Sequence, residues 1–258
     1  MKFNFKVNEI PKKELVEFVQ KYHYSPVFPK LTKHWLGIYD EQLNLVGCLT
    51  LGWGTQPKQT IQKLFPELDT KDYLEIGKMC MNEEMPRNSE TQMLKAVVEW
   101  IKEYRKDVSL LYTMADGIMG KVGYVYQAFN FKYGGSYFTD VFMTNTGEKV
   151  HPRSMKQILI ENAKFEGKEK LFWATPAYMK TIGMSRIRGL MFRYMYPLNK
   201  KAKKLLKDNN WNINYPKEKD LKWKKQLEKG KYIEVDKPEF NFDNAEVNKK
   251  NIEQHLKN

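Results

Sequence analysis

The stretch that decides the fold runs from Leu74 to Asp140. It begins with LEIGKMCM (Leu74–Met81), passes through the turn NEEMPRNS into SETQMLKAVVEWIKEY (Ser89–Tyr104), and reaches a second apolar run, LLYTMAD (Leu110–Asp116). GKVGYVYQAFNFKYGG (Gly120–Gly135) then leads to a last strand that begins SYFTD. These patterns predict the order strand, helix, strand, short helix, strand. Because a helix N-terminus beside a strand end attracts phosphate, we expect a cofactor and an active site here.

Shorter patterns on either side predict the remaining elements. Before the central stretch we expect a strand at Met1–Val7, an amphipathic helix at Pro11–Tyr22, a hairpin of His34–Tyr39 with Leu45–Leu51, and a short helix at Thr60–Phe65. After it we expect a helix capped by Ser154 that runs to about Asn162, strands at Leu171–Trp173 and Arg188–Pro197, and a basic helix from Lys200 to Lys207. Together these elements predict an α/β (α+β) fold with a mixed central sheet flanked by helices.

The composition indicates a folded, basic protein. Of the 258 residues 41% are hydrophobic, and 44 Lys and Arg against 31 Asp and Glu give a net charge of +13. This excess indicates an anionic partner, either nucleic acid or a membrane surface. No apolar stretch approaches the roughly 20 residues of a membrane span, and the N-terminus lacks a hydrophobic signal segment. We therefore expect a cytoplasmic protein, with Cys48 and Cys80 as buried core thiols.

Several common catalytic motifs are missing from the sequence. It contains no GxxxxGK[ST], GxGxxG, GxSxG or HExxH pattern, which argues against a P-loop nucleotidase, a dinucleotide-binding enzyme, an α/β-hydrolase and a zincin. The function class therefore has to be inferred from the predicted order of strands and helices.

That order resembles the GNAT acyltransferase fold. The resemblance implies a catalytic domain over residues 1–200, with residues 201–258 as a basic C-terminal extension packed on it or trailing from it. It also implies an acyl-CoA or related donor at the start of the Ser89–Tyr104 helix, held by Arg87, Asn88 and Ser89, with Ser89 as the helix cap. The family's glycine-containing turn is replaced by the acidic NEEMP. In the following segment Tyr124 or Tyr126 matches the family's general-acid tyrosine.

A closer resemblance covers roughly residues 15–200. The order His23-Tyr24-Ser25, hairpin, EIGKMCM, PRNSE, ADG and GYVYQ is similar to that of the Mom family of phage DNA-modification proteins. The resemblance implies a transferase that adds a carbamoylmethyl (acetamido) group to N6 of adenine and so protects phage DNA from restriction. If the chain is phage-encoded, its compartment is the cytoplasm of the host bacterium.

The same resemblance implies an iron site and catalytic residues. His23 and Tyr24 match the family's His-Tyr pair, and either Asp116 or Asp140 would supply a carboxylate, since iron sites favour His and carboxylate ligands. Tyr24 and Asp116 join the two tyrosines of GYVYQ as candidate catalytic residues. Asp116 ends a predicted strand, where sites gather in open α/β sheets.

A substrate adenine in double-stranded DNA has to leave the base stack before it can react. Contacts to the phosphate backbone are then needed, and basic residues supply them. The candidate strip is Arg186, Arg188, Arg193, Lys200, Lys201, Lys203 and Lys204. Two alternatives remain open: an N-acyltransferase that acts on a protein or small amine, and a non-enzymatic DNA-binding protein on a GNAT scaffold. The sequence leaves the oligomeric state open.

Overall fold

The computed structural model describes residues 3–23, 28–54, 57–152 and 155–241. The chain divides into two compact units, and each unit is made of three separate stretches of the sequence. Unit 1 comprises residues 1–115, 123–135 and 192–215, and unit 2 comprises residues 116–122, 136–191 and 216–258. Among the described residues, no helix combines the length and apolar character that crossing a bilayer requires.

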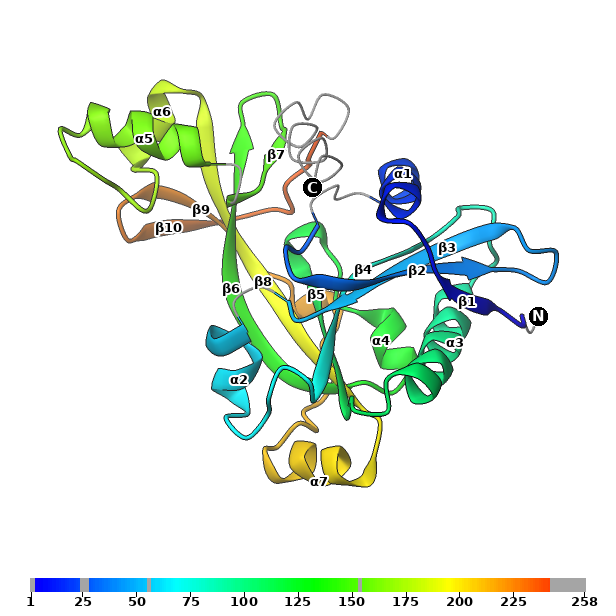
Figure 1. The fold of residues 1–258 in the computed structure, drawn as a ribbon. Helices are drawn as coiled ribbons and strands as arrows, with labels where there is room; N and C mark the ends of the chain where they lie inside the picture. Colours follow the sequence, from blue (N-terminus) through cyan, green and yellow to red (C-terminus); the bar gives the residue numbers. More distant parts are fainter. Residues whose placement is uncertain (1–2, 24–27, 55–56, 153–154, 242–258) are drawn as a thin grey trace. The chain divides into compact units, whose positions relative to one another are not determined.

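Unit 1 is built around a run of neighbouring strands (Figure 1). The strands are β1 (Lys6–Glu9), β2 (Thr32–Tyr39), β3 (Leu45–Gly52), β4 (Tyr73–Met81) and β5 (Leu110–Asp116). Neighbours from β1 to β4 pair antiparallel, whereas β4 and β5 pair parallel. The helices are α1 (Lys12–Tyr22), a 3-10 turn at Pro57–Gln59, α2 (Ile61–Leu64), α3 (Ser89–Tyr104), α4 (Tyr124–Ala128) and α7 (Lys200–Asp208).

Two long strands, β6 (Lys132–Thr144) and β8 (Met184–Pro197), contribute residues to both units. The strand order is β1-β2-β3-β4-β5-β8-β6-β7, and β9 joins β8 beside this path. The other elements of unit 2 are a 3-10 turn at Gly117–Met119, β7 (Lys149–Val150), α5 (Lys156–Phe165), α6 (Pro176–Thr181), a 3-10 turn at Glu218–Asp220, β9 (Trp223–Glu228) and β10 (Lys231–Val235).

This arrangement confirms the predicted mixed α/β class, with a central sheet of parallel and antiparallel strands and helices. The order β4, α3, β5, α4, β6 is the predicted strand–helix–strand–helix–strand order of a GNAT-like core. Helix α3 and strand β5 match their predicted bounds residue for residue. The hairpin is present as β2 and β3.

Four local predictions need correction. Residues 171–173 form no strand but an irregular connection between α5 and α6. Strand β6 begins at Lys132, earlier than the predicted SYFTD, and β1 begins only at Lys6. Helix α5 begins at Lys156 with Met155 in the cap position, while the predicted cap, Ser154, lies outside the described residues.

A cluster of buried side chains forms one core of unit 1 and includes residues beyond position 200. Trp211 packs against Phe65, with ring centroids 5.4 Å apart, and Ala202 and Leu206 of α7 belong to the same cluster. Gly134 leaves room for the indole, since a Cβ there would lie 2.4 Å from the ring. Ala202, Leu206 and Trp211 are thus part of the core of unit 1, although the predicted division at residue 200 stays a prediction.

The two cysteines are buried and free, as expected. They face each other across β3 and β4, with 3.4 Å between their Sγ atoms. The hydrogen bond between the two thiols raises the pKa of Cys48, and burial raises it further. The thiol of Cys48 is therefore a weak nucleophile, because reactivity belongs to the thiolate.

Helix α7 begins with a side-chain cap. The side chain of Asn199 accepts a hydrogen bond from the backbone N–H of Ala202 at 2.9 Å. We expect Asn199→Ala to lower the free energy of unfolding by about 1 kcal/mol, the usual worth of such a cap. Urea unfolding of both proteins checks this, and Asn199→Asp, which can still accept the bond, is expected to retain most of the stability.

Candidate functional site

The candidate site lies where β4 and β5 part. Their parallel pairing covers three residue pairs and ends with Glu75 opposite Tyr112, although both strands continue. Immediately beyond, the side-chain hydroxyl of Thr113 donates a hydrogen bond to the backbone carbonyl of Ile76 at 3.3 Å. A side-chain hydrogen bond thus links β4 and β5 just beyond the end of their backbone pairing.

The phenol of Tyr126 shares a hydrogen bond with Thr113, at the point where β4 and β5 part. Tyr126 lies on α4, its side chain is 8% exposed, and its ring packs against Phe131 and Tyr194. Burial raises the pKa of the Tyr126 hydroxyl, a hydrogen bond with Thr113 acts in the opposite direction, and the charge of Glu75 raises it further. The phenol is therefore protonated at neutral pH and can donate a proton.

Glu75 is the residue that sequence reasoning missed. Its side chain is 6% exposed, and Gly54 makes room for it, since a Cβ at Gly54 would lie 2.0 Å from Glu75 Oε2. The carboxylate acts on Tyr73 as well: burial raises the pKa of Tyr73, and Glu75 adds to the shift. The available signal was a single acid inside the apolar run LEIGKMCM, because buried carboxylates rarely occur without a partner or a function.

The two tyrosines of GYVYQ have different surroundings. Tyr124 is the first residue of α4 and is 50% exposed, whereas Tyr126 is buried. Gln127, which follows Tyr126 on α4, donates a hydrogen bond to the hydroxyl of Tyr194 at 3.1 Å. Of the two predicted acids, only Tyr126 shares a hydrogen bond with Thr113 and an electrostatic interaction with Glu75 in the described contacts.

The start of α3 is organised differently from the prediction. Asn88, not Ser89, occupies the cap position, with a left-handed backbone at φ 74°. Ser89 is the first helical residue, is buried, and donates its hydroxyl to the backbone carbonyl of Pro86 at 2.5 Å. Arg87 is exposed. Asn88 supplies the backbone conformation for which a glycine is the usual residue, because Asn tolerates the left-handed region.

His23 ends α1. Its backbone N–H donates to the carbonyl of Val19 at 2.9 Å, and its side chain is half-buried. Tyr24, its predicted partner, lies outside the described residues. The catalytic and metal-binding roles assigned to the pair stay predictions.

Asp116 serves the turn that follows β5. One of its oxygens accepts a hydrogen bond from the backbone N–H of Ile118 at 3.1 Å. The other forms an ion pair with the ammonium of Lys149 at 3.1 Å, and both side chains are largely buried. The carboxylate therefore has a structural environment within unit 2, and its predicted catalytic role stays a prediction.

Asp140 forms a two-point ion pair with Arg188. Its two oxygens accept hydrogen bonds from Nε and Nη2 of Arg188 at 2.8 and 3.1 Å. Among the described residues, no three His, Cys, Asp or Glu side chains form a group that could hold a metal ion. The predicted iron site includes Tyr24, which lies outside the described residues, and it stays a prediction.

The predicted DNA-binding residues fall into two groups. The four lysines of α7 are exposed, whereas the three arginines of β8 are partly buried. Arg188 binds Asp140, and Arg186 donates to the backbone carbonyl of Ala174 at 3.1 Å while its guanidinium lies over Phe142. Arg186 and Arg188 belong to unit 2, and Arg193 and the lysines to unit 1. Of these residues, the lysines are the ones presented to solvent.

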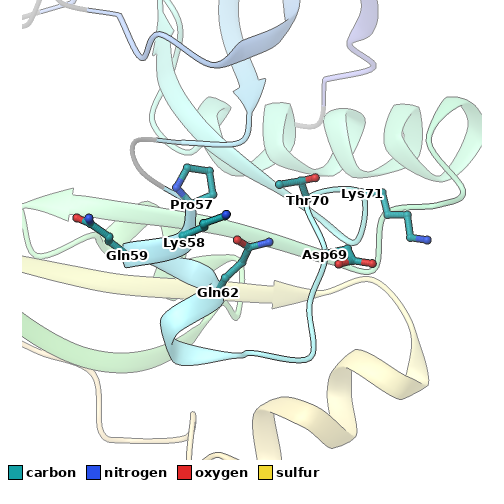
Figure 2. Close-up of a pocket in the computed structure, with 7 residues that line it drawn as sticks. All are labelled: Pro57, Lys58, Gln59, Gln62, Asp69, Thr70 and Lys71. Carbon is teal, nitrogen blue, oxygen red and sulfur yellow. The ribbon is translucent and has the colours of Figure 1, made fainter.

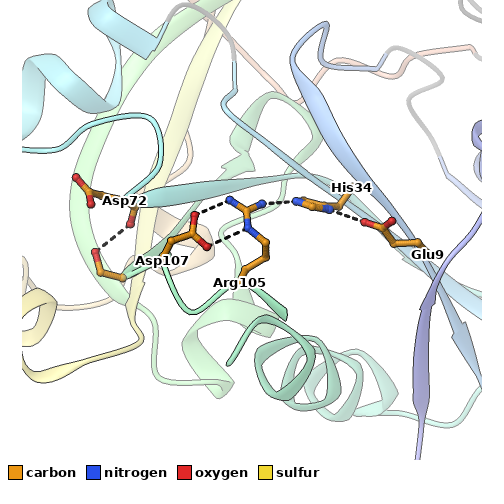
Figure 3. Close-up of polar contacts among 6 residues, drawn as sticks. Glu9, His34, Asp72, Arg105 and Asp107 are labelled. Carbon is orange, nitrogen blue, oxygen red and sulfur yellow. Dashed lines mark hydrogen bonds and ion pairs between the residues drawn. The ribbon is translucent and has the colours of Figure 1, made fainter. Parts of the chain in front are cut away.

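A chain of polar contacts lies elsewhere in unit 1 (Figure 3). His34 Nδ1 contacts a carboxylate oxygen of Glu9 at 2.5 Å, and His34 Nε2 contacts the guanidinium of Arg105, which also binds Asp107. Since arginine can only donate, Nε2 accepts and Nδ1 carries the proton. The chain joins β1, β2 and the end of α3 and contains none of the predicted site residues.

A surface pocket of about 690 Å³ also lies in unit 1, near α2 (Figure 2). Its lining is Pro57, Lys58, Gln59, Gln62, Asp69, Thr70 and Lys71. No predicted site residue lines it, and neither does Glu75 or Tyr126, so the pocket is separate from the candidate site.

The mixed sheet and the order β4, α3, β5, α4, β6 define a GNAT-like α/β fold. The solved structures that are similar to this chain include a GNAT family acetyltransferase from Elizabethkingia anophelis with acetyl-CoA bound. It is 14% identical, with a TM-score of 0.35, and the match covers 75% of this chain and 98% of that one. Another is the Bacillus subtilis acetyltransferase in complex with CoA, at 12% identity, a TM-score of 0.36, and 77% and 100% coverage.

The family model described as "Mom protein family" matches residues 4–217. The chain belongs to the Mom protein family. Among its relatives is the methylcarbamoylase Mom of Escherichia phage Mu, which is 28% identical over 200 residues that cover 77% of this chain and 78% of that protein. The predicted family is confirmed.

Proposed function

We propose that this chain is a DNA-modifying transferase that adds a carbamoylmethyl group to N6 of adenine in double-stranded DNA. The observation that carries the proposal is the buried pair of Tyr126 and Glu75 beside Thr113, in a chain of the Mom family. Protection of phage DNA from host restriction would follow from such a modification.

The transfer requires two proton movements. When N6 forms a bond to the donor carbon it has to lose a proton, and the departing group of the donor has to gain one. The protonated phenol of Tyr126 is suited to supply a proton, because burial raises its pKa. The carboxylate of Glu75 is suited to receive one. A positioned acid or base of this kind contributes about 10²- to 10⁴-fold to a rate.

The donor in this proposal is related to acyl-CoA but carries its leaving group on a methylene carbon, because attack of N6 on a thioester carbonyl would give an amide instead of a carbamoylmethyl group. The start of α3 is its expected site, because helix N-termini favour phosphate groups. Ser89 is turned into the protein by its bond to Pro86, so the exposed Arg87 and the backbone of the first turn are left as the donor's contacts. The acids of the preceding turn, Glu83 and Glu84, are exposed.

DNA contact is assigned to the exposed lysines of α7. We expect Lys203→Gln with Lys204→Gln to weaken binding to a DNA duplex and to reduce the slope of log affinity against log salt by about 2, since each phosphate contact contributes about 0.9. Fluorescence anisotropy over a salt series measures this. The matched control, Lys102→Gln with Lys106→Gln, removes the same charge from exposed positions outside α7 and is expected to leave the slope unchanged.

Mass spectrometry of nucleosides tests the function itself. DNA from cells that express the protein is expected to contain carbamoylmethylated adenine, and DNA from cells that express the Tyr126→Phe variant is expected to lack it. Unmodified adenine beside well-folded wild-type protein would contradict the proposal. Tight acetyl-CoA binding without DNA affinity would then favour an N-acyltransferase, and DNA affinity alone would favour a non-enzymatic binding protein.

A further inference from the structure

Two adjacent aromatic side chains of unit 2 point into solvent. Phe172 is 73% exposed and Trp173 is 46% exposed. Both belong to the connection between α5 and α6, two helices that Figure 1 labels. We call this pair the aromatic tip. Large apolar side chains are normally buried, and exposed ones that lie together mark interaction sites.

The backbone beneath the aromatic tip is fixed by a buried amide. Asn162 is 0% exposed. Its Nδ2 donates to the carbonyl of Trp173 at 3.4 Å, and its Oδ1 accepts from the backbone N–H of Thr175 at 3.2 Å. On the next residue of the connection, the carbonyl of Ala174 accepts a hydrogen bond from Arg186 at 3.1 Å.

The anchoring continues on the neighbouring helices. The hydroxyl of Thr175 lies 2.9 Å from Asn162 Oδ1 and 2.6 Å from Glu166 Oε1, and the hydroxyl of Tyr178 donates to Glu161 at 2.9 Å. Buried polar groups destabilise a protein unless they are hydrogen-bonded, and here their bonds hold the backbone of an exposed connection. Because this backbone is ordered before any partner binds, binding loses less conformational entropy.

The charge around the aromatic tip is positive. Residues 156–188 contain seven Lys and Arg against three Glu, and two of these acids, Glu161 and Glu166, are hydrogen-bonded within unit 2. Lys168 and Lys170 precede the tip in the chain and are exposed, as is Glu169 between them, and the ammonium of Lys170 lies 4.9 Å from the centroid of the Phe172 ring. Aromatic rings beside exposed cations fit nucleic acid better than an acidic or apolar protein surface, because rings stack on bases while cations meet phosphates.

We propose that the aromatic tip is a wedge that inserts into the base stack of duplex DNA, with Lys168 and Lys170 on the flanking phosphates. This inference rests on the proposed function, in which the substrate is adenine in DNA. Extrusion of a base costs the stacking of its neighbours. Apolar side chains inserted between base steps bend and unstack the duplex, so the wedge would unstack the base step that it enters.

The experiment uses the full chain and a series of duplexes that carry 2-aminopurine at successive positions, because this base fluoresces when it is unstacked. Wild-type protein is expected to raise its emission several-fold. The variant Phe172→Ala with Trp173→Ala is expected to bring emission back near that of the free duplex and to weaken binding roughly 5- to 100-fold, the range for lost base–aromatic stacking. Trp173→Phe, which keeps a ring, is expected to retain most of the emission increase.

The control removes an exposed aromatic residue from the other unit. Tyr104→Ala, at a side chain that is also exposed, is expected to leave emission and affinity unchanged, and thermal melting verifies that each variant is folded. Wild-type affinity and emission in the double variant would overturn the wedge. So would a wild-type protein that binds no duplex, or a double variant that loses only self-association or binding to another protein.

The outcome separates this inference from the proposed function. Modified adenine in wild-type cells together with tip-independent DNA binding overturns the wedge and leaves the function standing. Tip-dependent DNA binding and unstacking without modified adenine overturns the function and leaves the wedge standing.

Discussion

Replacement of Tyr126 by Phe is expected to lower adenine modification by about 10²- to 10⁴-fold, the usual contribution of a positioned general acid. The substitution removes only the hydroxyl that shares a hydrogen bond with Thr113. The ring contacts with Phe131 and Tyr194 are kept, so the fold is retained. Quantification of modified nucleosides at equal amounts of soluble protein measures the effect, and DNA affinity is expected to stay within about twofold of wild type.

Tyr124→Phe is the matched control for this prediction. It removes a hydroxyl from an exposed residue at the start of the same helix and is expected to retain most of the activity. A large loss with Tyr124→Phe and none with Tyr126→Phe would transfer the acid role to Tyr124. Full activity of both variants would remove α4 from the chemistry altogether.

The second large effect concerns stability. Trp211→Ala is expected to lower the free energy of unfolding by about 3–5 kcal/mol, the range for deletion of a large buried aromatic side chain. The indole packs on Phe65 and fills the space that Gly134 leaves open. Chemical denaturation measures the loss, provided that the transition is two-state.

Trp173→Ala serves as the control for stability, since Trp173 is exposed and surface substitutions usually change stability by about 0.5 kcal/mol or less. If Trp211→Ala cost less than about 1 kcal/mol, the segment around residue 211 would be only loosely packed on unit 1. The predicted picture of a trailing C-terminal extension would then be the better description.

The parts of the fold that were predictable are those in which local pattern and tertiary packing agree. Helix α3 keeps apolar residues at helical spacing along Ser89–Tyr104, and its bounds were predicted correctly. The run 171–173 looked like a strand because three apolar residues follow one another. Its actual path is set by Asn162 and Arg186, whose contacts no local pattern reveals. Gly134 was placed before the last strand, whereas it lies within β6 beside Trp211.

The candidate site was predictable to a smaller extent. Tyr126 could be named because family resemblance points to it, and Ser89 was placed on the correct helix. Glu75 was missed, since its importance depends on the space that Gly54 leaves and on the position at which β4 and β5 part. The carboxylates of Asp116 and Asp140 looked available as ligands because their cations, Lys149 and Arg188, are distant in sequence.

The division of unit 1 into three segments has a consequence for the synthesis of the protein. Its last segment, residues 192–215, carries Tyr194, Leu206 and Trp211, all of them buried in unit 1. A nascent chain therefore exposes the apolar partners of these residues, Phe65 among them, until Tyr215 has left the ribosome. Arrest of translation or proteolytic cleavage before that point leaves an incomplete core, and such species are prone to aggregation. Unit 1 can complete its core only after four-fifths of the chain has been made.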